Sequence, residues 1–116
     1  MSNKPTRFKL VFFSPTENTR PILDHLFQKY PNELGKIGEY DQCAFICPGT
    51  GQFKPSTAAN PVIGESGELE FVKEDRVELV VHDKGEKEEL RKAIAELKKV
   101  HPYEEVAYDV YRIEDV

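Results

Sequence analysis

The 116-residue sequence lacks the features of several large classes of protein. It contains no apolar run close to the roughly 20 residues that a membrane-spanning helix needs, so we expect no membrane partner. Its first residues, MSNKPTRF, lack the apolar core of a signal peptide, which favours a cytoplasmic location. Positive charge is also limited, because 16 Lys and Arg are scattered among 21 Asp and Glu and the net charge is −5. Since phosphate binding needs a basic face, we expect no nucleic-acid partner.

Cysteine is scarce as well. The two cysteines, Cys43 and Cys47, lie in the apolar run DQCAFICPG. Four residues apart on one strand, they would be separated by about 13 Å at roughly 3.3 Å per residue. Disulfide-bonded residues have Cα atoms within about 7 Å of each other, so the spacing excludes a bridge. It predicts two buried, reduced thiols, which suit a cytoplasmic compartment.

The sequence does contain enough apolar material for one small folded domain. Hydrophobic residues make up 39% of the chain and include seven Phe and five Tyr. This composition is too rich for a disordered protein. A chain of this length fits a single domain, which we expect to cover residues 1–116.

Hydrophobic periodicity predicts four strands and two helices in the order β-α-β-β-α-β. The predicted strands are residues 7–13, 42–47, 69–82 and 106–111, and the predicted helices are residues 18–30 and 86–100. The second helix is amphipathic, and Pro102 stands where it must stop and return into the last strand. The order predicts an α+β fold, a ferredoxin-like sandwich whose antiparallel four-stranded sheet carries both helices on one face.

Three local signals refine this prediction. Pro21 is tolerated only in the first turn of a helix, so the N-cap is expected at Asn18 or Thr19. Lys73 and Asp75 interrupt the apolar parity of the third strand, which predicts a bulge or a bend there. Residues 48–64 form a long predicted loop of small and turn-forming residues, and loops of that length in compact domains tend to be functional or mobile.

The first two strands are apolar on both faces, whereas two helices can cover only one. Val11 and Phe13 lie on the opposite side of the first strand from Leu10 and Phe12. Another copy of the chain is the simplest cover for the second face, so the sequence predicts a homo-oligomer, either a dimer or a trimer. The alternative is that this second apolar face is small enough to remain exposed to water.

Several short motifs follow one another in a specific order. They are KIGEY (36–40), CAF (43–45), GTGQFKP (49–55), NPVIG (60–64), LE (69–70) and HPYEEVAYD (101–109). Their order and spacing, from about Phe8 to Arg112, resemble the insert domain of the Ngg-one-interacting-factor-three-like (YqfO-type) family. The resemblance implies a fold similar to CutA and PII signalling proteins, a ferredoxin-like domain that assembles through its sheets.

The resemblance also carries expectations about activity. In full-length members of that family, the insert lies between two halves that supply a paired metal site through His, Asp and Glu residues. This sequence contains neither half, so it resembles a stand-alone insert, and a hydrolase activity would lack its catalytic residues here. We therefore expect no catalytic residues and no certain cofactor. A metal-dependent hydrolase rests on family analogy alone.

The glycine-rich segment is one candidate binding site. Glycines allow backbone N–H groups to approach an anion, and PII-like proteins use the corresponding loop for partner and ligand contacts. We therefore consider ligand or protein-partner binding by Gly49, Thr50, Gly51, Phe53 and Asn60. The phosphate-binding signature GxxxxGK[ST] is absent from the sequence, so the glycines are equally consistent with a turn after the second strand.

The polar segment after the second helix is the other candidate. His101, Glu104 and Glu105 could ligate a divalent metal, and the CutA resemblance implies an association with copper. The alternative is that His101 caps the preceding helix and the segment makes interface hydrogen bonds. Phe53, Tyr103 and Tyr108 are predicted interface residues. The leading interpretation is a small oligomeric binding or regulatory module without catalysis, with a divalent-metal-binding protein as the alternative.

Overall fold

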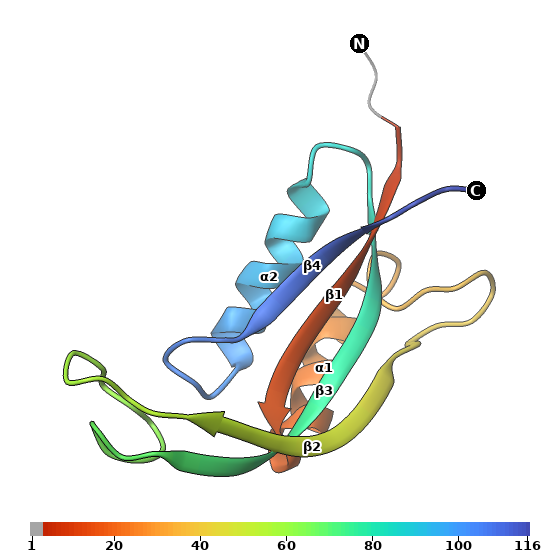
Figure 1. Cartoon of the computed structure of the whole chain (residues 1–116). Helices are drawn as coiled ribbons and strands as arrows, with labels where there is room; N and C mark the ends of the chain where they lie inside the picture. The colour runs from red at the N-terminus through yellow and green to blue at the C-terminus, as the bar shows by residue number, and fades with distance from the viewer. Residues whose placement is uncertain (1–3) are drawn as a thin grey trace.

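The computed structural model describes residues 4–116 and contains a four-stranded antiparallel sheet in the order β2-β3-β1-β4. The elements are β1 (Thr6–Pro15), a 3-10 turn η1 (Thr16–Asn18), α1 (Thr19–Lys29), β2 (Phe45–Phe53), β3 (Glu70–Asp83), α2 (Glu88–Val100) and β4 (Tyr108–Ile113). Figure 1 shows both helices behind the same face of the sheet. The predicted ferredoxin-like α+β fold is therefore confirmed. None of the helices in residues 4–116 is long and apolar enough to cross a membrane.

The core lies between the sheet and the two helices. Alternate residues of β1 and β3 point toward the helices, which is why Leu10, Phe12 and Leu79 are almost fully buried. The facing stripes of α1 and α2 complete this core, with residues Ile22, Leu23, Leu26, Phe27, Leu90, Ala93 and Leu97. Each of the larger buried side chains contributes about 1.5–3 kcal/mol relative to exposure.

The starts of the two helices are held in different ways. α1 begins after Asn18, as predicted, and Pro21 falls in its first turn where no N–H is needed. α2 follows Lys87, whose backbone is left-handed and whose side chain makes no capping bond. Asp83 at the end of β3 caps the helix instead. Its carboxylate accepts hydrogen bonds from the N–H groups of Gly85, Lys87 and Leu90 at 2.7, 2.9 and 3.1 Å.

The second strand differs from its prediction. The sequence predicted a strand at 42–47 followed by a loop, but β2 begins at Phe45 and continues to Phe53. Its partner β3 continues to Glu70, so residues 45–53 each find an antiparallel partner on β3. Gly49, Thr50 and Gly51 therefore lie in a strand. An outer strand tolerates such glycines because it is paired on one side only. The connecting loop is residues 54–69.

The predicted burial of the two cysteines is wrong. Cys47 is exposed because β2 is an outer strand and nearly all of its residues face solvent, and Cys43 is half-buried in the segment before β2. The prediction failed because the apolar residues around the two cysteines lie at the edge of the sheet and not in the core. The exclusion of a disulfide is confirmed, as both thiols are free.

The expected irregularity in β3 is a bend. The ladders of β3 with β1 and β2 run in continuous register past Asp75, so there is no bulge in this part of the described chain. Asp75 is buried on the helix side, where the Thr19 hydroxyl donates to its carboxylate at 2.6 Å. Figure 1 shows β2 and β3 curving together away from β1. We call this projecting ribbon, residues 49–53 and 70–74, the β2–β3 arm.

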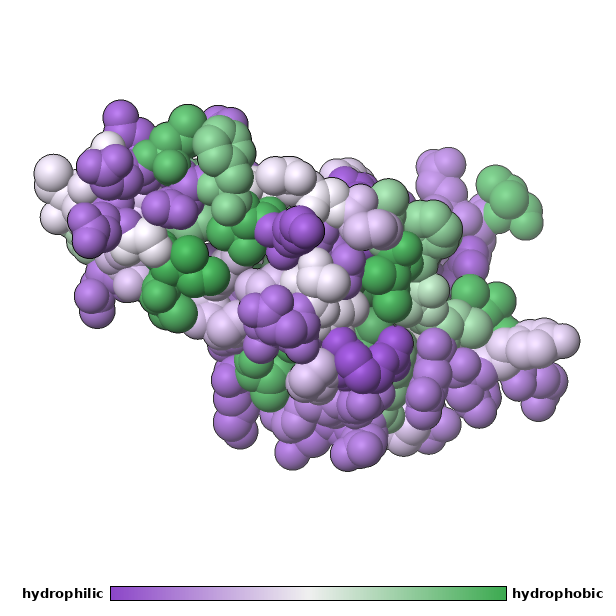
Figure 2. Space-filling view, turned by 90° about the horizontal axis from the view of Figure 1, so that it is seen from below, coloured by the Kyte–Doolittle hydropathy of each residue, from purple (hydrophilic) through white to green (hydrophobic). Residues whose placement is uncertain are grey.

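The helix-free face of the sheet is only partly apolar. Val11 and Val80 point to this face but are 1% and 6% exposed, so the chain itself covers them. Phe45 and Tyr111 on the same face are 64% and 54% exposed. Figure 2 views the molecule from below, along the side of β2 and β3, and shows apolar groups separated by polar ones on that side.

Candidate functional site

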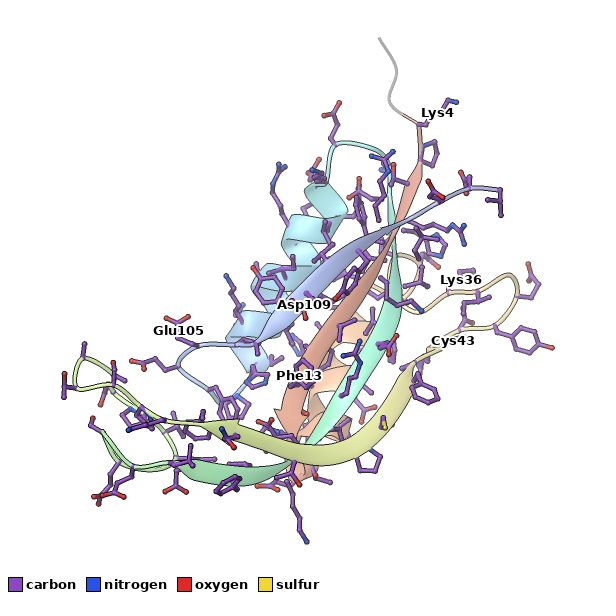
Figure 3. The ribbon with its side chains drawn as sticks, in the orientation of Figure 1. Lys4, Phe13, Lys36, Cys43, Glu105 and Asp109 are labelled. Atoms are coloured by element: carbon purple, nitrogen blue, oxygen red, sulfur yellow. The ribbon has the colours of Figure 1, made fainter. Side chains whose placement is uncertain are left out.

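A cavity of about 480 Å³ lies between the β2–β3 arm and the segment that links α2 to β4, residues 101–107. Most of its wall is aromatic, aliphatic or proline, contributed by Phe13, Phe53, Pro55, Ala59, Pro61, Val62, Ile63, Tyr103 and Ala107. Figure 3 shows Phe13 near the end of β1 and Glu105 on the linking segment, both on the side where the arm curves round. A concave, mostly apolar space of this size is typical of a small-molecule site.

His101 anchors the linking segment to the sheet. Its buried ring donates from Nε2 to the carbonyl of Phe13 at 2.6 Å and accepts the N–H of Tyr103 on Nδ1 at 3.1 Å. Burial lowers the pKa of His101, while the Phe13 carbonyl and the Glu74 carboxylate oppose this change. The ring is therefore held neutral in one tautomer, and it fixes the wall of the cavity against β1.

Tyr103 joins the linking segment to the arm. Its hydroxyl donates to Oε2 of Glu74 at 2.8 Å, and its ring lies 6.3 Å from that of Phe53. Burial and the adjacent Glu74 carboxylate raise the pKa of Tyr103 far above its usual value, so the hydroxyl stays protonated as a donor.

Glu104 joins the linking segment to the loop after β2. Its carboxylate accepts the backbone N–H of Asn60, with N···O distances of 3.2 and 3.3 Å to the two oxygens. Such a carboxylate acceptor is stronger than a neutral one. The two candidate segments of the sequence, 49–64 and 101–105, therefore meet at one cavity.

The structure brings together some of the predicted ligand-binding residues. Gly51 and Phe53 line the cavity and Asn60 binds its wall. Gly49 and Thr50 belong to the β2 ladder and do not line it. The phosphate-cradle interpretation is wrong, because these glycines lie in an extended strand rather than in a loop whose N–H groups converge on an anion.

The predicted metal site is not formed. In the described part of the chain no group of three or more His, Cys, Asp or Glu residues is placed to hold a metal ion. His101 has no nitrogen lone pair to offer, since Nε2 carries the proton donated to Phe13 and Nδ1 accepts from Tyr103. His101 is instead a structural residue at the end of α2, as the alternative interpretation expected. Its backbone N–H donates a hydrogen bond to the carbonyl of Leu97.

Tyr108 also differs from its predicted position. It lies on the helix side of β4, packed partly against the core, with the Lys98 ammonium 5.3 Å from its ring centre. Sequence reasoning missed Phe13 and Glu74 as wall residues of the cavity. The parity of β1 and β3 places both on the helix-free face. The bond from His101 to the Phe13 carbonyl and the bend of the arm at Glu74 bring them beside Tyr103.

Among solved structures, the periplasmic divalent cation tolerance protein CutA from Archaeoglobus fulgidus aligns with a TM-score of 0.58 at 17% identity, covering 95% of this chain and 86% of that one. At this identity the likeness shows the fold, so the chain has the CutA-like form of the ferredoxin-like fold. A Bacillus cereus protein related to NIF3 aligns with a TM-score of 0.74 at 33% identity, over 99% of this chain and 27% of that chain.

The curated relatives agree with that second structure. The chain is 43% identical over 104 residues to the GTP cyclohydrolase 1 type 2 homolog of Halalkalibacterium halodurans, covering 90% of this chain and 26% of the relative. It is 52% identical over 80 residues to the protein of the same name from Bacillus subtilis, covering 69% and 20%. No protein-family model matches the chain. The chain belongs with the NIF3-related, YqfO-type proteins and spans about a quarter of the length of the relatives it matches.

Proposed function

We propose that this chain is a small ligand-binding module that assembles with copies of itself, and that the cavity beside the β2–β3 arm is its binding site. The observation that supports this proposal most strongly is the convergence of residues 49–64 and 101–105 on one apolar cavity. Gly51, Phe53 and Tyr103 are the proposed contact residues, and Asn60 is proposed to hold the wall through its bond to Glu104. The proposal assigns binding, not catalysis, to this segment.

The wall of the cavity is organised before any ligand arrives. Hydrogen bonds from Tyr103 to Glu74, from Asn60 to Glu104 and from His101 to Phe13 tie the linking segment to three other segments. A preformed wall saves the entropy that a mobile loop would lose on binding. This arrangement supports a binding role for residues that the motifs single out.

The assembly part of the proposal concerns the helix-free face. Phe45 and Tyr111 are large apolar side chains that remain more than half exposed there, and a second copy of the chain would cover them. We propose a dimer or a trimer formed through this face. A cytoplasmic location, which the sequence predicts, is part of the same proposal.

Binding is tested with indole, a neutral apolar probe. The chain has no tryptophan, so indole emission anisotropy, excited beyond the tyrosine absorption band, reports the probe without a tryptophan background. We expect saturable binding that Phe53→Ala weakens by tenfold or more. Phe71→Ala is the matched control, because Phe71 is an exposed phenylalanine of the same arm that does not line the cavity. Equal loss in both variants, or no saturable binding by the native chain, would overturn the proposal.

A further inference from the structure

The charges around the cavity have one predominant sign. Among its lining residues, Glu74, Glu104 and Glu105 are carboxylates, whereas Lys54 is the one ammonium. Both exposed glutamates, Glu104 and Glu105, stand on the linking segment at the edge of the apolar wall. The lining thus carries two more negative charges than positive ones.

The hydrogen bonds in the wall preserve this negative charge. Glu74 accepts from the Tyr103 hydroxyl and Glu104 accepts from a backbone N–H, and neither donor carries a positive charge that would offset the carboxylate. The nearby guanidinium of Arg76 lies 5.7 Å from the ring centre of Phe13, but its Nε donates to Glu78 at 3.2 Å. Its charge is therefore already paired with a carboxylate that does not line the cavity.

The apolar part of the wall also favours a cation. Phe13, Phe53 and Tyr103 line the same space, and the faces of aromatic rings attract ammonium groups. Carboxylates at the edge and aromatic rings in the wall together match a molecule with an apolar body and a protonated amine. They oppose a triphosphate, whose negative charges would face three carboxylates.

We propose that the ligand of this cavity is a small amphipathic cation, an apolar or aromatic body bearing a protonated amine, and not a nucleotide or another phosphate anion. This inference rests on the proposed binding function and adds the chemical class of the ligand.

Three probes with the same ring test the inference. Tryptamine is a cation near neutral pH, indole is neutral and indole-3-acetate is an anion, and all three are read by indole emission anisotropy with the full chain. We expect the affinity to fall in the order tryptamine, indole, indole-3-acetate. The difference between the two charged probes should shrink at high salt, because these edge charges are exposed to solvent. GTP, added as a competitor at fixed ionic strength, should not displace tryptamine.

The variant Glu105→Gln removes one edge charge while keeping the size of the side chain. Tryptamine should bind about twofold to sixfold more weakly, as expected for a unit charge roughly 4–8 Å away in a water-like dielectric, and indole-3-acetate should bind correspondingly more tightly. Indole affinity should not change. Glu114→Gln is the control, because it makes the same change in net charge on the C-terminal segment beyond β4, which lies away from the cavity (Figure 1).

The outcomes separate the inference from the function on which it rests. Equal affinity for the three probes, tighter binding of indole-3-acetate, or displacement by GTP would overturn the cationic assignment and leave the binding function standing. An absence of saturable binding by all three probes would overturn both. The opposite responses of tryptamine and indole-3-acetate to Glu105→Gln would establish the assignment, since a merely structural role for Glu105 would shift all three affinities in the same direction.

Discussion

Replacing His101 tests how the cavity wall is held. In His101→Ala, the Phe13 carbonyl and the Tyr103 N–H lose the partners they have at 2.6 and 3.1 Å. A buried polar group left without a partner costs about 1–3 kcal/mol, so two such groups predict a loss of about 2–6 kcal/mol in the free energy of unfolding. Urea unfolding followed by circular dichroism at pH 7.5 measures it. His101→Gln, which retains a donor and an acceptor, should lose less.

The same residue gives the stability a pH dependence of known sign. Burial lowers the pKa of His101 below its usual 6.5, so the unfolded chain binds a proton more readily than the folded one. The stabilisation from the neutral ring is present above pH 6.5 and is lost as the pH falls through the lower pKa of the folded state. The native chain should therefore lose its advantage over His101→Gln between pH 7.5 and 5. A loss below 1 kcal/mol in His101→Ala, or an advantage that grows toward pH 5, would refute this reasoning.

Three further predictions concern the fold that positions the site. Asp83→Ala should destabilise the chain by about 2–4 kcal/mol in urea unfolding, because three N–H groups at the start of α2 lose a charged acceptor. Burial acts to raise the pKa of Asp83, but the bonds from those N–H groups outweigh it and the pKa is lowered. The stabilisation by the Asp83 carboxylate should therefore be lost as the pH falls below 3.8. A difference between the two chains that does not depend on pH would contradict the capping role. Gly35→Ala should cost more than 1 kcal/mol, since φ is +76° and the added Cβ would meet Phe27 at 2.5 Å; an unchanged melting temperature would contradict it. Cys47 should react with a thiol reagent faster than the half-buried Cys43, measured by peptide mapping after brief labelling. Equally slow labelling of both thiols would mean that β2 is covered.

The fold could be predicted from the sequence because its core follows simple periods. The stripe of α1 and the alternation of Leu10 and Phe12 in β1 appear directly in the sequence and are buried where expected. Asp75 breaks the apolar parity of β3, but the sequence does not show the Thr19 hydroxyl that lets it be buried. The extent of β2 was missed although the length of its partner β3 was predicted, because Pro48, Gly49 and Gly51 are residue types that favour turns over strands.

The candidate site could be predicted in part. The motifs marked Phe53, Asn60 and Tyr103, but the chemistry assigned to them depended on which groups would meet. His101 resembled a metal ligand until the structure placed both of its nitrogens on backbone partners. Phe13 and Glu74 carry no motif of their own. Phe13 reaches the cavity because His101 binds its carbonyl, and Glu74 because the β2–β3 arm bends toward residues 101–107.

Native mass spectrometry of the full chain with indole tests the central claim most directly. It reports the number of copies and the number of bound probes in the same spectrum. The account predicts a dimer or a trimer that carries one indole per copy, and loss of the bound mass in a chain with Phe53→Ala. A monomer without bound indole, at concentrations where the native chain is fully folded, would contradict it.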